Sequence, residues 1–169
     1  PEIFSPNQDG NDDFVNIIEL LLNIKGRLII TAIGKSANIA SKMVATLNST
    51  GQPSIFLHAA DAIHGDLGNI QKEDVVMFIS NSGNTPEIKQ LLPLIKNMSV
   101  SLIAMTGNIK SSLAQEADYV LDVSVEEEAC PNNLAPTSSS TAQLVMGDAL
   151  AMSLLSCKKF SDKDFARFH

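Results

Sequence analysis

The sequence predicts an α/β fold in which a doubly wound, five-stranded parallel sheet is flanked by helices. One observation is that the predicted strands are nearly continuous apolar runs, such as DVVMFIS at 74–80, and do not alternate with polar residues. Continuous runs are typical of parallel sheets that are covered on both faces. The other is that strand-like and helix-like segments alternate along the chain with short links between them. Together they favour a Rossmann-like or flavodoxin-like architecture.

The elements follow from residue type and periodicity, taken in chain order. Runs rich in Ile, Val, Leu and Phe predict strands, and apolar residues three or four apart predict helices. The expected strands are 27–33, 54–57, 74–80, 101–106 and 119–124, and the expected helices are 36–49, 86–97, 109–117 and 138–156.

The remaining segments are shorter or more polar. Residues 60–70 form a short link before the third strand, and the tail from residue 160 begins as a short capped helix. We expect an N-terminal lead-in over 1–25 and one domain over 26–169, a length sufficient to bury a core.

Composition excludes several classes of protein. A hydrophobic content of 44% and a mean hydropathy of +0.10 exclude a disordered chain. A net charge of -7 without any basic cluster argues against a nucleic-acid partner. Two cysteines are too few for a disulfide framework. No signal peptide and no apolar run of membrane-spanning length are present, so we expect a cytoplasmic protein with no membrane partner.

Ligands of doubly wound folds bind beyond the carboxyl ends of the strands, so the turns that follow strands are where function is expected. The first such turn, AIGKSA at 32–37, contains GKS but is not a Walker A loop, because Ile29 stands where that motif requires glycine. A plain interpretation is that Ser36 caps the next helix and Lys35 is solvated.

The second turn is SNSGNTPE at 80–87. Three hydroxyls, from Ser80, Ser82 and Thr85, surround Gly83, which permits close approach of a ligand to the backbone. The start of the following helix favours an anion. An ordinary cap needs only one hydroxyl, with Thr85 as N-cap and Pro86 in the first helical position. The pattern therefore favours a phosphate site.

The third turn, APTSSST at 135–141, is also rich in hydroxyls and also precedes a helix. The acids and bases nearest to these turns are His64 in HGDLG, Glu87 and Glu128. A lone histidine or glutamate on a loop is usually solvated, so the residues alone support phosphate binding more than they support catalysis.

Several motifs together resemble one family: GKS, HGDLG, SNSG followed by Glu87, EACP with LAPTSS, and LVMGDALA. The region from about residue 26 to residue 169 resembles the sugar isomerase (SIS) domain of arabinose-5-phosphate isomerases. That resemblance implies interconversion of D-ribulose 5-phosphate and D-arabinose 5-phosphate, without a cofactor or metal, as a step toward Kdo in lipopolysaccharide or capsule synthesis. It also implies a homo-oligomer, dimeric or tetrameric, with sites at the subunit interfaces. Relatives often continue beyond the position of His169 into paired CBS domains, so we expect either an excised SIS domain or a short form of the family.

The resemblance also implies site residues. It assigns Lys35, Glu87, Glu128, His64 and His169 to catalysis, and Ser36, Ser80, Asn81, Ser82, Thr85, Thr137, Ser138 and Ser139 to the substrate and its phosphate. Ala32 and Ala37 replace glycines of many relatives around GKS, and Asp61 replaces a glutamate.

Isomerisation through a cis-enediol needs a carbon base, an acid–base group for the oxygens, and a positive charge near them. Lys35 would stabilise the oxygens, and Glu128 is the first choice for the base, with Glu87 second. His64 and His169 would assist ring opening and proton transfer. Two alternatives stay open: a non-catalytic sugar-phosphate sensor, and an isomerase of another phosphosugar.

Overall fold

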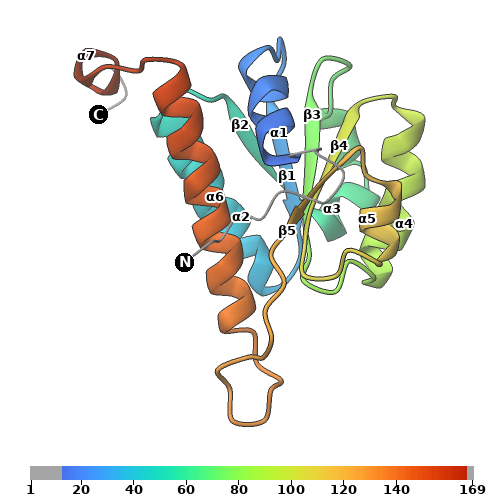
Figure 1. Ribbon diagram of the computed structural model, residues 1–169. Coiled ribbons are helices and arrows are strands. Elements are labelled where there is room, and N and C mark those ends of the chain that lie inside the picture. Colours follow the sequence, from blue (N-terminus) through green and yellow to red (C-terminus); the bar gives the residue numbers. More distant parts are fainter. Residues whose placement is uncertain (1–12, 167–169) are drawn as a thin grey trace.

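A parallel five-stranded sheet with strand order β2-β1-β3-β4-β5 forms the centre of the molecule (Figure 1). This computed structural model describes residues 13–166. The strands are β1 (Leu28–Ala32), β2 (Ser54–His58), β3 (Val75–Ile79), β4 (Ser101–Thr106) and β5 (Tyr119–Asp122). The predicted α/β fold with a doubly wound parallel sheet is confirmed.

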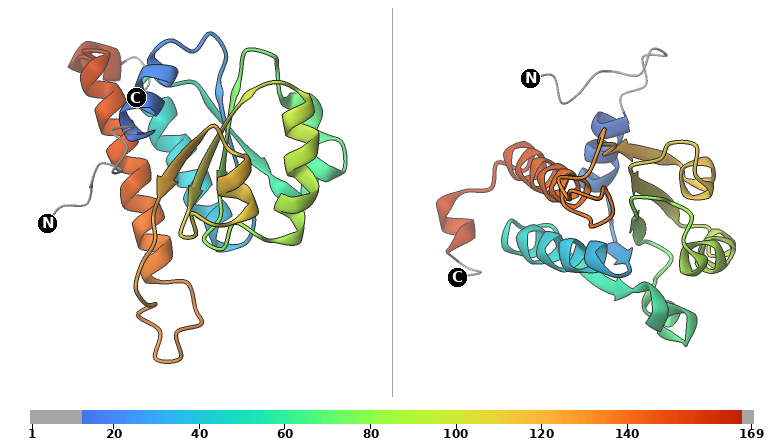
Figure 2. Two further views of the ribbon diagram at one scale, coloured as in Figure 1. Left: turned by 45° about the vertical axis from the view of Figure 1, so that its right-hand side comes forward. Right: turned by 90° about the horizontal axis from the view of Figure 1, so that it is seen from below.

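Helices cover both faces of the sheet (Figure 2). One layer contains α1 (Asp13–Leu22), α2 (Lys35–Ser49) and α6 (Ser138–Cys157), and the other contains α3 (Ala59–Ile63), α4 (Pro86–Asn97) and α5 (Ser112–Glu116). A 3-10 helix, η1 (Asp66–Asn69), precedes β3, and a short helix, α7 (Asp162–Phe165), follows α6.

The central strand β3 shows why its sequence is apolar throughout. Val75, Met77 and Ile79 pack into the hydrophobic cluster on the α2 and α6 side, whereas Val76 and Phe78 pack into the cluster on the α4 side. Successive side chains of a strand point to opposite faces, so both sets must be apolar when both faces are covered.

Helices α1 and α5 differ from the sequence-based expectation, and α3 and η1 occupy most of the predicted short link over 60–70. Helix α1 was not predicted, because the polar residues that precede it obscured its amphipathic pattern, yet its Ile17, Ile18 and Leu21 are buried in the core. Helix α5 begins at Ser112 and not at residue 109, since the Ser111 hydroxyl caps it by accepting from the N–H of Ala114. The domain boundary at residue 26 stays a prediction.

Candidate active site

The turn after β1 and the loop after β3 lie side by side, because Ala32 and Ile79, the last residues of two paired strands, are register partners. The first turns of α6 approach them from the adjacent layer. These three segments enclose a cavity of about 290 Å³ at the carboxyl edge of the sheet, the edge where doubly wound folds bind ligands. Its lining comprises Ile33, Lys35, Ser36, Ile79, Ser80, Asn81, Ser82, Thr85, Pro136, Ser139, Ser140 and Gln143.

Residues 80–85, predicted above to bind phosphate and here called the phosphate loop after that prediction, are shaped by their own hydroxyls. The Ser80 hydroxyl accepts from the N–H of Gly83 at 3.1 Å, and the Ser82 hydroxyl accepts from the N–H of Asn84 at 3.3 Å. A hydroxyl that accepts one hydrogen bond still has its own proton to donate. Ser80 and Ser82 therefore keep donors for an anion while they hold the loop.

The loop ends at the start of α4 as predicted, with Thr85 as N-cap and Pro86 in the first helical turn. Thr85 does not use its hydroxyl to cap the helix; its Oγ1 is buried and has no hydrogen-bond partner among residues 13–166. A buried hydroxyl without a partner is costly unless a ligand or water satisfies it. With the positive end of the α4 dipole beside it, this donor suits an anion.

The turn after β1 differs from the plain interpretation of GKS. Gly34, not Ser36, is the N-cap of α2, and its φ of 61° with ψ of -134° is a conformation that favours glycine. Lys35 is the first residue of α2, is exposed, and forms no ion pair within the described part of the chain. Its ammonium group is therefore available to a ligand in the cavity.

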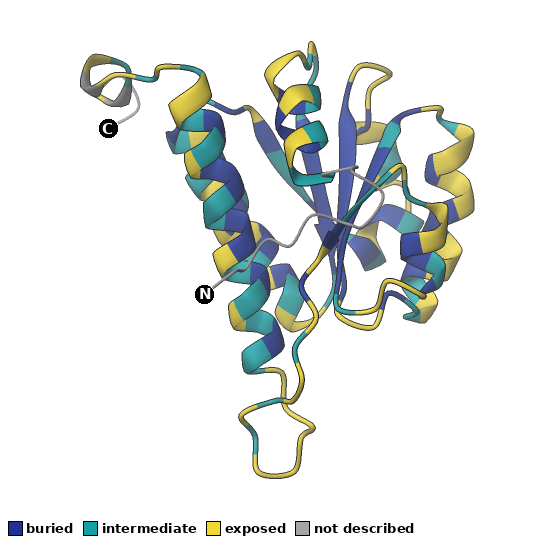
Figure 3. Cartoon of the chain, viewed as in Figure 1, coloured by how far each residue is buried: buried dark blue, intermediate teal, exposed yellow. Residues whose placement is uncertain are grey.

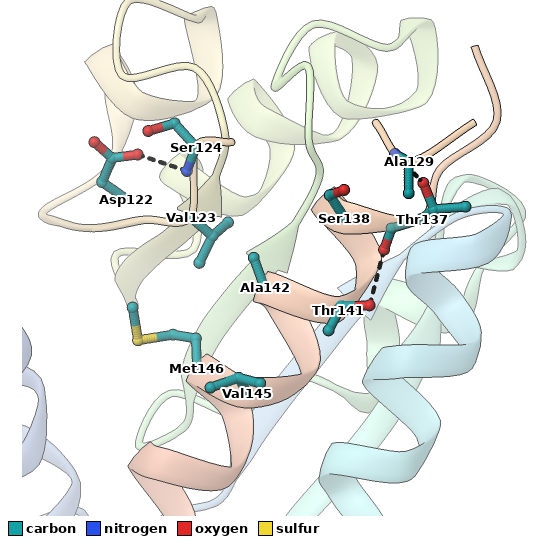
Figure 4. Close-up of a pocket in the computed structure, with 10 residues that line it drawn as sticks. All are labelled: Asp122, Val123, Ser124, Ala129, Thr137, Ser138, Thr141, Ala142, Val145 and Met146. Carbon is teal, nitrogen blue, oxygen red and sulfur yellow. Dashed lines mark hydrogen bonds between the residues drawn. The ribbon is translucent and has the colours of Figure 1, made fainter. Parts of the chain in front are cut away.

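The start of α6 contributes to two different hollows. Ser139 and Ser140 line the cavity, whereas Thr137 and Ser138 line a separate hollow of about 680 Å³ between α6 and the end of β5 (Figure 4). Neighbouring residues of a helix point about 100° apart, so one hydroxyl-rich run faces both sides. Thr137 and Ser138 were predicted to bind the substrate or its phosphate, but they do not line the cavity that contains the other predicted binding residues.

Glu128 lies in the arm, residues 125–137, which connects β5 to α6 and is largely exposed (Figure 3). Its carboxylate Oε2 accepts from the Thr137 N–H at 2.7 Å, the Thr137 hydroxyl at 3.1 Å and the Ser139 N–H at 3.2 Å. Glu128 therefore satisfies donors at the N-terminus of α6, a favourable position for a negative charge.

The polar groups at the start of α6 lower the pKa of Glu128 to about 2, with the Ser139 side chain as the largest cause and the Thr137 N–H as the next. Ser139 Oγ is buried and makes no hydrogen bond of normal geometry within the described residues, so the contacts that hold the carboxylate are those from Thr137 and from the Ser139 N–H. A carboxylate with so low a pKa has little affinity for a proton.

Among the described residues, neither Glu87 nor His64 lines the cavity. Glu87 is half-buried in the first turn of α4, directly after the phosphate loop, and His64 is exposed at the end of α3. His169 lies outside the described residues. The catalytic roles of these three stay predictions.

Sequence reasoning missed Gln143, which lines the cavity and is 1% exposed. A signal was present, because Gln143 follows Ser139 by four residues and therefore lies on the same face of α6. A buried polar residue on that face of α6 must either form a hydrogen bond within the protein or line a ligand site.

Residues 20–153 match the family model described as the SIS domain. The chain belongs to the SIS domain family. This SIS domain is 56% identical over 158 residues to the arabinose 5-phosphate isomerase KdsD of Pseudomonas aeruginosa. It is 54% identical over 163 residues to a probable arabinose 5-phosphate isomerase of Haemophilus influenzae. The alignments include 94% and 96% of this chain but 48% of each relative, so the chain spans about half the length of the curated relatives it matches.

The SIS domain is also similar to a solved structure, the c3406 protein of Escherichia coli CFT073 in complex with arabinose 5-phosphate. The two chains are 46% identical, with a TM-score of 0.91 over 93% of this chain and 84% of the other.

Two further properties concern residues 13–166 of the SIS domain. No three His, Cys, Asp or Glu side chains there gather into a group that could hold a metal ion. None of the helices in that range is long and apolar enough to cross a membrane.

Proposed function

We propose that this SIS domain interconverts D-ribulose 5-phosphate and D-arabinose 5-phosphate. The observation that carries the proposal is one cavity that combines the phosphate loop with Lys35, which forms no ion pair among residues 13–166. The similarity to relatives named arabinose 5-phosphate isomerase supports the choice of substrate.

The phosphate would bind at residues 80–85. Ser80, Ser82 and Thr85 supply hydroxyl donors, and the N-terminus of α4 supplies a favourable potential. Because the phosphate is remote from the reacting carbons, its binding energy can hold the sugar in one register without taking part in bond changes.

The reaction would pass through a cis-enediol. A base removes the proton from C2 of the open-chain aldose, the C1 carbonyl oxygen gains a proton, and the enediol forms between C1 and C2. Delivery of a proton to C1 and loss of the proton from the C2 oxygen then give the ketose. Lys35, at the cavity wall, would stabilise the negative charge that develops on these oxygens.

The geometry of Glu128 bears on the choice of base. Glu128 was the first choice for the carbon base in the sequence-based hypothesis. A carboxylate held by three donors with a pKa of about 2 is, however, a weak proton acceptor. We therefore propose Glu87 as the carbon base and Glu128 as the residue that positions Ser139. His64 and His169 keep their proposed roles in ring opening and proton transfer.

We also propose a homo-oligomer, a dimer or tetramer with sites at subunit interfaces. Glu87 and His64 do not line the cavity of a single chain, and α6 exposes the apolar side chains of Val145 and Met152, which are 48% and 47% exposed. Light scattering of the purified protein tests this proposal, and a monomer at all concentrations would contradict it. The product would serve Kdo synthesis in the cytoplasm.

The test of the function is incubation of the purified protein with ribulose 5-phosphate, without added metal, followed by NMR. We expect arabinose 5-phosphate to form, to be lost in Glu87→Gln, and to persist at a reduced rate in Glu128→Gln. Binding of pentose phosphates without any conversion would instead favour the sensor. Loss of activity in Glu128→Gln alone would return the base role to Glu128.

A further inference from the structure

Asn84 belongs to the phosphate loop but does not line the cavity. Its side-chain oxygen Oδ1 accepts from the N–H of Ser112 at 3.1 Å and from the Ser112 hydroxyl at 3.0 Å. Its Nδ2 donates to the carbonyl oxygen of Ser82 at 3.1 Å. The Asn84 side chain therefore connects the phosphate loop to Ser112, the first residue of α5.

The N–H of Ser112 fixes which way the Asn84 amide faces. A backbone N–H can only donate, so the side-chain atom that meets it must be the amide oxygen. The NH₂ group is then turned toward Ser82, whose carbonyl oxygen accepts from it. The backbone N–H of Asn84 also donates to Ser82 Oγ at 3.3 Å. Asn84 thus contacts Ser82 at both its main-chain oxygen and its hydroxyl.

The start of α5 is a firm support for the phosphate loop. A Cβ added at Gly83 would lie 2.1 Å from Ser111 Oγ, so the loop and the helix are in direct contact. The Leu113 N–H donates to the Gly83 carbonyl oxygen at 3.2 Å, and Leu113 is fully buried in the core. A support that is itself fixed by packing can hold a ligand-binding side chain in one orientation.

Ser82 depends on this support more than Ser80 does. Ser80 is buried, and its N–H donates to the carbonyl oxygen of Met105 in β4 at 3.0 Å. Ser82 is exposed, and among residues 13–166 it accepts its hydrogen bonds from Asn84. An exposed side chain that must be ordered on binding lowers affinity, and holding it in place beforehand avoids that loss.

We propose that Asn84 is a positioning residue for phosphate binding. By joining the phosphate loop to the start of α5, it orients the Ser82 hydroxyl toward the phosphate without touching the ligand itself. This inference rests on the proposed function for the phosphate group as the ligand of residues 80–85. It adds the contact between Asn84 and Ser112, which lies outside the cavity, to the groups that determine affinity.

The test measures binding of inorganic phosphate by NMR titration, and the KM and kcat of isomerisation, in Asn84→Ala. This substitution removes the amide and keeps the backbone N–H that contacts Ser82. We expect phosphate binding to weaken by about 3- to 10-fold, the range of one neutral hydrogen bond. KM should rise by a similar factor with kcat unchanged, because the phosphate is bound alike in substrate and transition state. A merely structural defect would reduce the number of active molecules, which lowers kcat and leaves KM unchanged.

Substitutions of Ser112 test the connection from the side of α5. Ser112→Ala should weaken phosphate binding by about two- to fivefold, and Ser112→Thr, which keeps the hydroxyl, should restore it. Because Ser112 acts on the loop through Asn84, the double variant with Asn84→Ala should bind phosphate no more weakly than Asn84→Ala alone. Losses that multiply in the double variant would overturn the inference. Ser112→Ala also provides the test if Asn84→Ala does not fold.

Asn108→Ala is the matched control, because Asn108 is exposed in the segment before α5 and its Oδ1 accepts from the N–H of Lys110 in its own turn. We expect it to change phosphate binding by less than about twofold. Equal losses in Asn108→Ala and Asn84→Ala, or a fall in kcat without a rise in KM, would overturn the inference. An unaltered protein that binds phosphate and arabinose 5-phosphate but does not isomerise would overturn the proposed function alone, whereas one that binds neither would overturn both.

Discussion

At the scale of single residues, Gly83 determines the shape of the phosphate loop. Its φ is 62°, and a Cβ at this position would lie 2.1 Å from Ser111 Oγ. Both the backbone conformation and the space therefore require glycine. The hydroxyls of Ser80 and Ser82 are aimed only as long as this turn keeps its conformation.

We expect Gly83→Ala to lower the free energy of unfolding by about 2–4 kcal/mol, from left-handed strain and overpacking, and to weaken phosphate binding. Urea unfolding and phosphate titration measure the two effects. Gly68→Ala is the control, since a Cβ there meets nothing within 4 Å, and its effect should stay within about 0.5 kcal/mol. Equal effects of the two substitutions would show that the loop tolerates a side chain.

The carboxylate of Glu128 gives a second prediction at this scale. Its pKa in the folded protein is about 2 against an ordinary 4.5, so its stabilising contribution is fully present above pH 4.5 and is lost as the pH falls through about 2. Carboxyl NMR shifts should show a midpoint near 2 for this residue, with Glu128→Gln providing the assignment. A midpoint near 4.5 would mean that the α6 N-terminus does not hold the carboxylate.

At the scale of elements, Asp74 ties β1 to β3 at the amino edge of the sheet, opposite the cavity. Its carboxylate accepts from the N–H, Nε and an Nη of Arg27 and from the N–H of Gln71, at 2.7 to 3.2 Å. Burial alone would raise the pKa of Asp74, but these hydrogen bonds outweigh it and hold the pKa below its ordinary value. The side chain is 1% exposed, so a lost partner cannot be replaced by water.

We expect Asp74→Asn to lower the free energy of unfolding by about 3 kcal/mol, because it leaves the Arg27 guanidinium without its charge partner. The contribution of Asp74 should also fade as the pH falls below about 3.8, the ordinary value of an aspartate. Asp148→Asn breaks the ion pair with Lys42, whose partners are 44% and 45% exposed, and should cost less than about 1 kcal/mol. Chemical denaturation compares the two variants. A similar loss of unfolding free energy in both would contradict the role of buried Asp74 in holding β1 and β3 together.

At the scale of the whole molecule, ligand binding should stabilise the fold, because the cavity joins segments from both ends of the chain. At a concentration 100 times its Kd, arabinose 5-phosphate should add about 2.7 kcal/mol and raise the Tm by about 5–10 °C. Differential scanning fluorimetry measures the shift. Arabinose without phosphate is the control, and an equal shift with it would argue against the phosphate loop as the main binding element.

The sequence by itself determined the sheet and the helix start that follows β3. Apolar runs such as that of β3 and the Thr85–Pro86 pair are local signals, because strand and helix periodicity and capping depend on residues within a few positions of one another. The positions of the turns at the carboxyl edge then follow from the parallel topology.

Only the tertiary structure decided which side chains share the cavity. The contact between Ser36 and Gln143 joins residues 107 positions apart, and the separation of Ser139 from Ser138 depends on how α6 is rotated against the sheet. The hydrogen bonds between the Glu128 carboxylate and the N–H groups at the start of α6 depend on the conformation of the arm, residues 125–137. Long-range packing sets these relations, and periodicity along the chain carries no information about which distant helix faces meet.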